Sequence, residues 1–223
     1  MDIKIKGFEE LTKGLDAMQR KQIPFATMKA INETANEVKK AEDRKIKRVF
    51  KKPTKATQNS VIIIYANKAR LEATVKIKDR PFSGSNASIN AYLNPHIYGG
   101  GRSRKGSEKR LQSDNRMTRD RSLVPGQGVK LNKFGNLTKG AMKKMMDGKK
   151  YFSVKEGSKA ANHLRPGIYL RLSKKRITPM VIYGDKATYQ VRFKFYDVAN
   201  KVIDKKLTKN FSKALDHALR TAR

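Results

Sequence analysis

The chain has no cysteine and no tryptophan, and only three histidines among its 223 residues. The lack of cysteine excludes disulfides and thiolate metal sites. His96, His163 and His217 are scattered and lack the paired spacing that a metal site needs. We therefore expect no metal, no other cofactor and no catalysis based on cysteine or histidine.

Long hydrophobic runs are also missing from the sequence. The longest aliphatic run is Val61–Ile64, whereas a membrane helix needs roughly 20 apolar residues. The first residues, MDIKIKGFEEL, contain no hydrophobic region of the signal-peptide kind. We therefore expect a soluble protein with no membrane partner.

Acidic residues are scarce, because 19 Asp and Glu stand against 52 Lys and Arg, which gives a net charge of +33. A chain of this charge repels itself and lowers its free energy beside an anionic partner. Nucleic acid, an acidic membrane surface and acidic proteins all meet that description. Hydrophobic residues make up 38% of the chain, which indicates a modest core.

Helical periodicity is clearest toward the two ends of the chain. A short strand containing Ile3 and Ile5 precedes a short helix that begins near Phe8. Pro24, a residue tolerated at the first helical position, opens a long helix that runs toward Phe50. A terminal helix is predicted from apolar residues at four- and five-residue steps, namely Val198, Val202, Leu207, Phe211, Leu215 and Leu219.

Strand patterns lie between these helices. The run Val61–Tyr65 and the alternation that ends at Ile77 predict a hairpin. Asn136 caps a short predicted helix, LTKGAMKKMM. Further strands are predicted at Tyr151–Val154, Ile168–Leu172, Met180–Tyr183 and Thr188–Phe195. We expect an α+β fold, a single domain over residues 1–223, with a mainly antiparallel sheet packed against a long N-terminal helix and a C-terminal helix.

Residues 80–133 show little periodicity and many Gly, Ser, Asn and Pro residues. Nine basic and three acidic residues fall within 80–121, and the only helical pattern is a short one near Ser107–Leu111. Loops of this length are commonly functional or disordered. We expect an extended basic loop or arm here.

A second basic stretch covers the latter half of the long predicted helix. Residues 37–52 contain eight basic and three acidic side chains. Runs of this kind neutralise phosphates without reading sequence, although many are only solvated faces. The residues expected to contact DNA or an acidic partner are Lys39, Lys40, Arg44, Lys47, Arg48, Lys51 and Lys52.

A glycine-rich segment inside the basic loop comes close to a phosphate-binding motif. Gly101–Ser107 has the glycine spacing of a Walker A loop, but no lysine stands between Gly106 and Ser107 to reach the phosphates. Asp79, Asp185 and Asp197 lie near strand ends without a second catalytic group. We expect no catalytic residues, which leaves a nucleotide-dependent enzyme as the weakest hypothesis and non-specific DNA or RNA binding as the main alternative.

Several stretches, taken in order, resemble one protein family. They are AINETANEVKKA (Ala30–Ala41), YLNPHIYGGGRSRKGSEKRL (Tyr92–Leu111), LVPGQGVKLNKFGNLTKGAM (Leu123–Met142) and YQVRFKFYDVA (Tyr189–Ala199). Their order resembles that in tailed-phage minor tail proteins of the Z or tail-completion type, which are structural proteins of the virion neck.

This resemblance implies a virion protein at the head–tail junction or tail end, assembled in the host cytoplasm. It implies a homo-oligomeric ring whose partners are portal or adaptor proteins, tail tube or tail terminator proteins, and, by non-specific contact, packaged double-stranded DNA. Gly99, Gly100 and Gly101 would form a strand-to-loop joint. The docking surface would consist of Arg102, Arg104, Lys105, Lys109 and Arg110.

Overall fold

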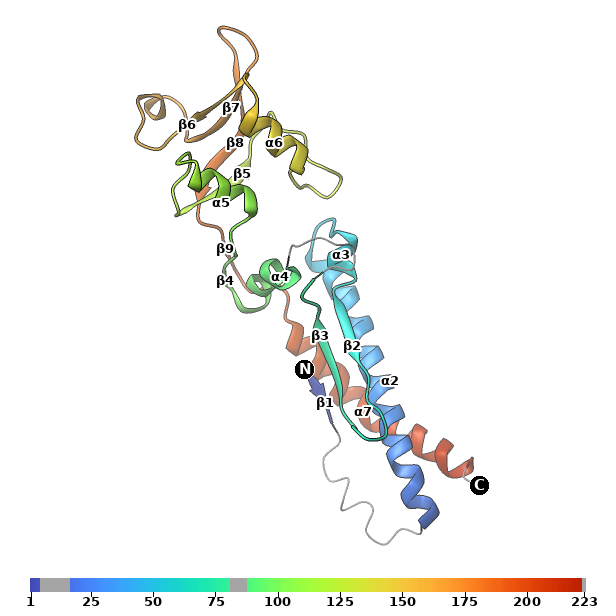
Figure 1. Cartoon of the computed structure of the whole chain (residues 1–223). Helices are drawn as coiled ribbons and strands as arrows, with labels where there is room; N and C mark the ends of the chain where they lie inside the picture. The colour runs from blue at the N-terminus through green and yellow to red at the C-terminus, as the bar shows by residue number, and fades with distance from the viewer. Residues whose placement is uncertain (5–16, 81–87, 222–223) are drawn as a thin grey trace. The chain divides into compact units, whose positions relative to one another are not determined.

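A computed structural model describes residues 1–4, 17–80 and 88–221 (Figure 1). The chain divides into two compact units, and each is described by itself. The first unit comprises Met1–Leu93 and Val191–Arg223, and the second comprises Asn94–Gln190. The expectation of a single domain over residues 1–223 stays a prediction.

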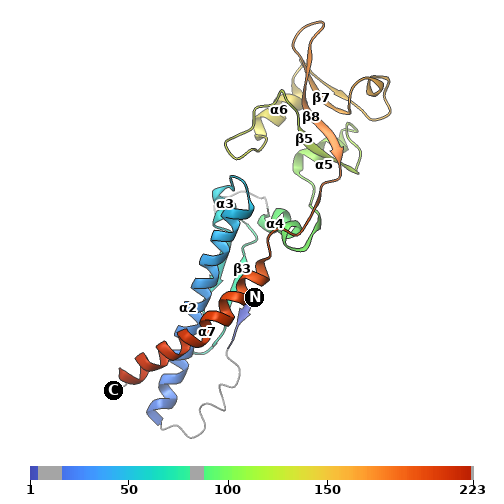
Figure 2. The same ribbon diagram turned by 180° about the vertical axis from the view of Figure 1, so that it is seen from behind.

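The first unit is built on two long antiparallel helices, α2 (Ala17–Val49) and α7 (Phe195–Arg220). They run side by side in both views (Figures 1 and 2). Ala26 and Ala30 of α2 pack against Ala214 and Ala218 of α7, and all four are buried. Small side chains at the contact let two helices approach closely.

A polar pair lies buried between the same helices. The side-chain amide of Asn210 on α7 donates a hydrogen bond to the Thr34 hydroxyl on α2 at 3.0 Å. That hydroxyl donates in turn to the carbonyl oxygen of Ala30 at 2.8 Å. Because both polar groups have partners, their burial costs little free energy and fixes how the two helices meet.

A three-stranded antiparallel sheet packs against α2. Its order is β1 (Asp2–Ile3), β3 (Ala73–Ile77) and β2 (Val61–Ile64). The predicted hairpin is confirmed, with Val61 opposite Ile77. Asn32 of α2 binds the chain just after β2. Its side chain donates to the Ala66 carbonyl at 3.0 Å and accepts from the Ala66 N–H at 2.8 Å. The short helix α3 (Lys55–Gln58) precedes β2.

The second unit has a four-stranded antiparallel sheet in the order β5, β8, β7, β6. These strands span Arg121–Pro125, Ile177–Asp185, Gly167–Arg171 and Tyr151–Val154. Helices α5 (Gly106–Ser113) and α6 (Lys139–Asp147) contribute Leu111 and three methionines to its core. A 3-10 turn covers Lys159–Asn162, and β4 (Gly100–Gly101) pairs with β9 (Thr188–Tyr189). The boundary between the units falls within α4 (Ile89–Tyr98).

The close approach of β7 and β8 requires glycine at position 167. A Cβ atom on Gly167 would lie 2.4 Å from the carbonyl oxygen of Val181. The two strands pair antiparallel around this point, with an irregularity between Ile168 and Tyr169. Any side chain at Gly167 would therefore push the strands apart.

The predicted α+β class is confirmed, with the long N-terminal helix packed on the C-terminal helix and with antiparallel sheets. Some boundaries were wrong. Helix α2 begins at Ala17 rather than Pro24, which lies inside it and leaves one ladder hydrogen bond unmade. Thr138, not Asn136, caps α6, because its hydroxyl accepts from the Ala141 N–H at 3.1 Å. The helix predicted from Phe8 falls on residues outside the described ranges.

Residues 88–133 do not show the extended basic loop that the sequence predicted. They form α4, β4, α5 and β5, of which α5 confirms the short helix expected near Ser107–Leu111. Helix α4 buries Ile89 and Leu93, although Pro95 lies inside it. The last predicted strand also ends early, at Tyr189, and α7 begins at Phe195.

No helix among the described residues is long and apolar enough to cross a membrane.

Candidate functional site

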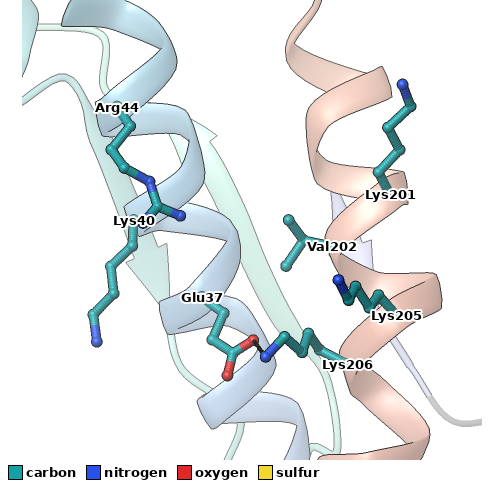
Figure 3. Close-up of a pocket in the computed structure, with 7 residues that line it drawn as sticks. All are labelled: Glu37, Lys40, Arg44, Lys201, Val202, Lys205 and Lys206. Atoms are coloured by element: carbon teal, nitrogen blue, oxygen red, sulfur yellow. Dashed lines mark ion pairs between the residues drawn. The ribbon is translucent and has the colours of Figure 1, made fainter.

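The first cationic surface is an open hollow of about 500 Å³ between α2 and α7, here named the α2–α7 groove (Figure 3). It is lined by Glu37, Lys40, Arg44, Lys201, Val202, Lys205 and Lys206. Five of these side chains are cationic and one is anionic. The groove therefore concentrates positive charge contributed by two helices that are far apart in the sequence.

Only one cation of the α2–α7 groove has a carboxylate partner among the described residues. The Nζ of Lys206 lies 3.5 Å from Oε2 of Glu37, and Figure 3 marks this pair with a dashed line. Both side chains are more than a third exposed, and such a pair contributes at most about 1 kcal/mol. The other four cations of the groove are exposed to solvent.

The structure brings together some of the basic residues predicted on the long helix and separates others. Lys40 and Arg44 line the groove, whereas Lys39 is paired with Asp43 at 2.8 Å. The other members, Lys47, Arg48, Lys51 and Lys52, are exposed but do not line it.

Sequence reasoning missed the three groove lysines that come from α7. Lys201 and Lys205 stand four residues apart on a helix that the apolar pattern had predicted. Residues at that spacing share one face of a helix. Counting lysines on each face of the predicted helix could therefore have found Lys201 and Lys205. It could not have shown that they lie beside Lys40 and Arg44.

The glycine segment of the second unit turns the chain sharply. Gly99 and Gly100 have φ angles of +81° and +87°, in the left-handed region that favours glycine. Gly99 follows helix α4, and Gly100–Gly101 forms β4. The predicted strand-to-loop joint is therefore a helix-to-strand joint.

Glu108 of α5 holds the segment after this joint in place. Its carboxylate accepts two hydrogen bonds from the Arg102 guanidinium, at 2.8 and 2.5 Å. It also accepts from the backbone N–H of Lys105 at 2.7 Å and of Leu123 at 3.0 Å. Glu108 is only 1% exposed, so its four bonds tie the loop, α5 and β5 together.

The pKa of Glu108 reflects this arrangement. Burial alone would raise the pKa, but the hydrogen bonds from Arg102, Leu123 and Lys105 outweigh burial and hold it below its ordinary value. Glu108 therefore stays ionised and neutralises Arg102. Arg102 therefore supports the loop through Glu108, and its docking role stays a prediction.

The second cationic surface is a hollow of about 250 Å³, here named the arginine hollow. It is lined by Arg102, Ser103, Arg104, Glu108, Arg119, Arg121, Ser122, Lys186 and Ala187. Arg121 is occupied by ion pairs with Glu156 and Asp185. In the described part of the chain, Arg104, Arg119 and Lys186 have no carboxylate partner, and Arg104 reaches only the Gln112 side-chain oxygen, at 3.3 Å.

The remaining predicted docking residues do not line the arginine hollow. The side chain of Arg110 pairs with Asp147 at 3.0 Å, Lys105 precedes the first turn of α5, and Lys109 is exposed. Sequence reasoning missed Arg119 and Lys186. Arg119 precedes β5 and Lys186 follows β8, so the pairing of these strands brings the two together, and both line the hollow with Arg104. Local patterns do not reveal such long-range pairing.

Comparison with known proteins identifies a family for this chain. The model of the family described as prophage minor tail protein Z (GPZ) matches residues 5–223, which is nearly the whole chain. No curated protein matches the chain, and no solved structure matches it. The resemblance seen in the sequence is thereby confirmed: the chain belongs to the prophage minor tail protein Z (GPZ) family of phage tail proteins.

Proposed function

We propose that this chain is a non-enzymatic structural protein of the virion that completes the tail and joins it to the head. Several copies form a ring in the neck or at the tail end, between portal or adaptor proteins and tail tube or tail terminator proteins. The observation that carries the proposal is the arginine hollow, a cationic surface held in shape by buried Glu108 in a protein of a tail family.

The partner of the arginine hollow is an acidic protein surface. A guanidinium presents a planar fork of donors that matches a carboxylate, and Arg104 and Arg119 both lack such a partner among the described residues. The hydrogen bonds of Glu108 order the loop before any partner arrives, which lowers the entropy cost of docking. Truncating one member of a buried charge pair at an interface costs about 2–5 kcal/mol.

Two substitutions test this docking role in a phage whose own copy of the gene is deleted and complemented. Arg104→Ala should leave heads and tails largely unjoined, because it removes a charge from the arginine hollow. Gly100→Val should do the same with every charge retained, because valine at a φ of +87° strains the backbone and alters the path of the loop. The measurement is the fraction of joined particles seen by negative-stain microscopy, together with the infectious titre.

Lys143→Ala is the matched control, because it removes one positive charge from an exposed position on α6 of the same unit, outside both the arginine hollow and the predicted docking residues. It should give a near-normal titre. Normal particles from both Arg104→Ala and Gly100→Val would contradict the docking role of this loop.

The alternative function is that of a free protein that binds DNA or RNA without reading sequence. The α2–α7 groove is the observation that favours it. The two functions differ in location, because a joining protein remains in purified particles whereas a free binding protein does not. Contact with packaged double-stranded DNA is also part of the proposed virion role.

A further inference from the structure

The α2–α7 groove carries its charge in two short rows. Lys40 and Arg44 stand four residues apart on α2, and Lys201 and Lys205 stand four residues apart on α7, which is a rise of about 6 Å in each helix. All four side chains are exposed. Figure 3 shows them on the two neighbouring helices, with Val202 between. A large ligand can therefore reach both rows.

The groove holds more positive charge than its own lining neutralises. Glu37 is the one acidic residue of the lining, and Lys206 is paired with it. The four other cations repel one another across a shared hollow and attract counterions from solution. A polyanion that occupied the groove would relieve the repulsion and release those counterions, which favours binding at low salt.

The cations of the groove suit a row of phosphates. Four of the five groove cations are lysines, and a lysine ammonium is a point charge on a flexible stem. Such groups can adjust to successive phosphates along a backbone. The arginine hollow, with four arginines and one lysine, shows the opposite composition.

We propose that the α2–α7 groove binds the phosphodiester backbone of double-stranded DNA without reading its sequence, and that Lys201 and Lys205 supply main contacts. The lining contains no asparagine or glutamine that could pair with a base edge. A hollow of about 500 Å³ is the size of a small-ligand site, so it admits a short stretch of one backbone and leaves the bases outside. This inference rests on the proposed contact with packaged DNA and assigns that contact to named residues.

The test measures binding of the purified full-length chain to a short blunt-ended DNA duplex of mixed sequence. Fluorescence anisotropy gives the affinity at several salt concentrations between about 50 and 200 mM. The groove variant carries Lys201→Gln and Lys205→Gln. The matched control carries Lys209→Gln and Lys213→Gln, which removes the same charge from exposed positions of α7 outside the groove lining. Circular dichroism checks that both variants are folded.

The groove variant should bind the duplex roughly 60-fold more weakly than the parent chain at about 0.1 M salt. Its slope of log affinity against log salt should be shallower by about 2, since each lost phosphate contact removes about 0.9. The control should keep the slope and the affinity within a few-fold of the parent. Poly-glutamate, added as a competitor, should displace the duplex poorly.

If the groove variant and the control variant lost the same DNA affinity, binding would depend on net charge alone. That result would overturn the proposal. The proposal would also be overturned if poly-glutamate displaced the duplex at the same concentration of negative charge. The ligand of the groove would then be an acidic protein surface. Because the assay uses free protein and free DNA, its failure leaves the joining experiment on Arg104 and Gly100 untouched.

Discussion

Replacing Glu108 with alanine should lower the free energy of unfolding of the second unit by about 3–5 kcal/mol. The substitution leaves the Arg102 guanidinium, whose side chain is 11% exposed, without its counter-charge. It also removes the acceptor of the Lys105 and Leu123 N–H groups. Breaking one side of a buried ion pair is far more costly than the pair's net contribution, because a charge stays buried without a partner.

Hydrogen exchange measured by mass spectrometry can report this loss for each unit separately. Asp147→Ala is the matched control, because it breaks an ion pair with Arg110 in which both side chains are about half exposed, and should cost at most about 1 kcal/mol. Similar protection in the Glu108→Ala and Asp147→Ala proteins would show that the Glu108 bonds do not hold the loop.

The pH dependence of the Glu108 contribution has a definite sign. The folded pKa lies below the ordinary value of 4.5, so the folded state favours the ionised carboxylate. The contribution is present above about pH 4.5 and is lost as the pH falls through the folded pKa. Acid should therefore weaken the second unit, and the Glu108→Ala protein should lack this part of the acid sensitivity.

Replacing Glu42 with methionine should raise the free energy of unfolding of the first unit by about 3 kcal/mol at pH 7. Glu42 on α2 is fully buried, and neither of its carboxylate oxygens has a hydrogen-bond partner within the described residues. Burial raises its pKa to about 8, with a further contribution from Asp43 and an opposing one from Lys45. Methionine has a similar length and no charge to desolvate.

The pH dependence of the Glu42 contribution has the opposite sign to that of Glu108. In the unfolded chain Glu42 ionises above about pH 4.5, whereas in the folded chain it stays protonated up to about pH 8. Stability is therefore lost as the pH rises between these values, by about 5 kcal/mol in total. Denaturant unfolding of the parent and Glu42→Met proteins at pH 5, 7 and 8.5 tests this. The difference between the two proteins should grow with pH.

Glu33→Met is the control, because Glu33 lies on the same helix but is only partly buried. It should change stability far less than Glu42→Met does. A Glu42→Met protein that is less stable than its parent at pH 8.5 would show that the Glu42 carboxylate has a stabilising partner after all.

The sequence predicted the long helices because their apolar periodicity is sustained over many turns, as in α7 from Phe195 to Arg220. It also predicted β6 at Tyr151–Val154 with the correct bounds. It missed α4, because Pro95 and two asparagines made Ile89–Tyr98 resemble a loop. It missed β5, because Arg121–Pro125 becomes a strand only through pairing with β8, about 60 residues later.

In the candidate sites, too, local sequence predicted some residues, and only long-range contacts revealed the others. Local charge density singled out Lys40 and Arg44, and the family resemblance implied Arg104. The structure places each of them in a cationic hollow. The sequence could not distinguish Arg102, which Glu108 neutralises, from Arg104 two residues later. Lysines and arginines from distant segments complete each hollow, and only the fold brings them together. Which of these residues bind a partner stays a prediction.

The most direct test of the proposed role is an electron cryomicroscopy map of the intact virion. We predict several copies of this chain in a ring in the neck or at the tail end. We further predict that Arg104 and Arg119 of each copy face carboxylates of a neighbouring protein. A map in which the chain is absent from the virion, or in which the arginine hollow of every copy faces open solvent, would contradict the proposed role.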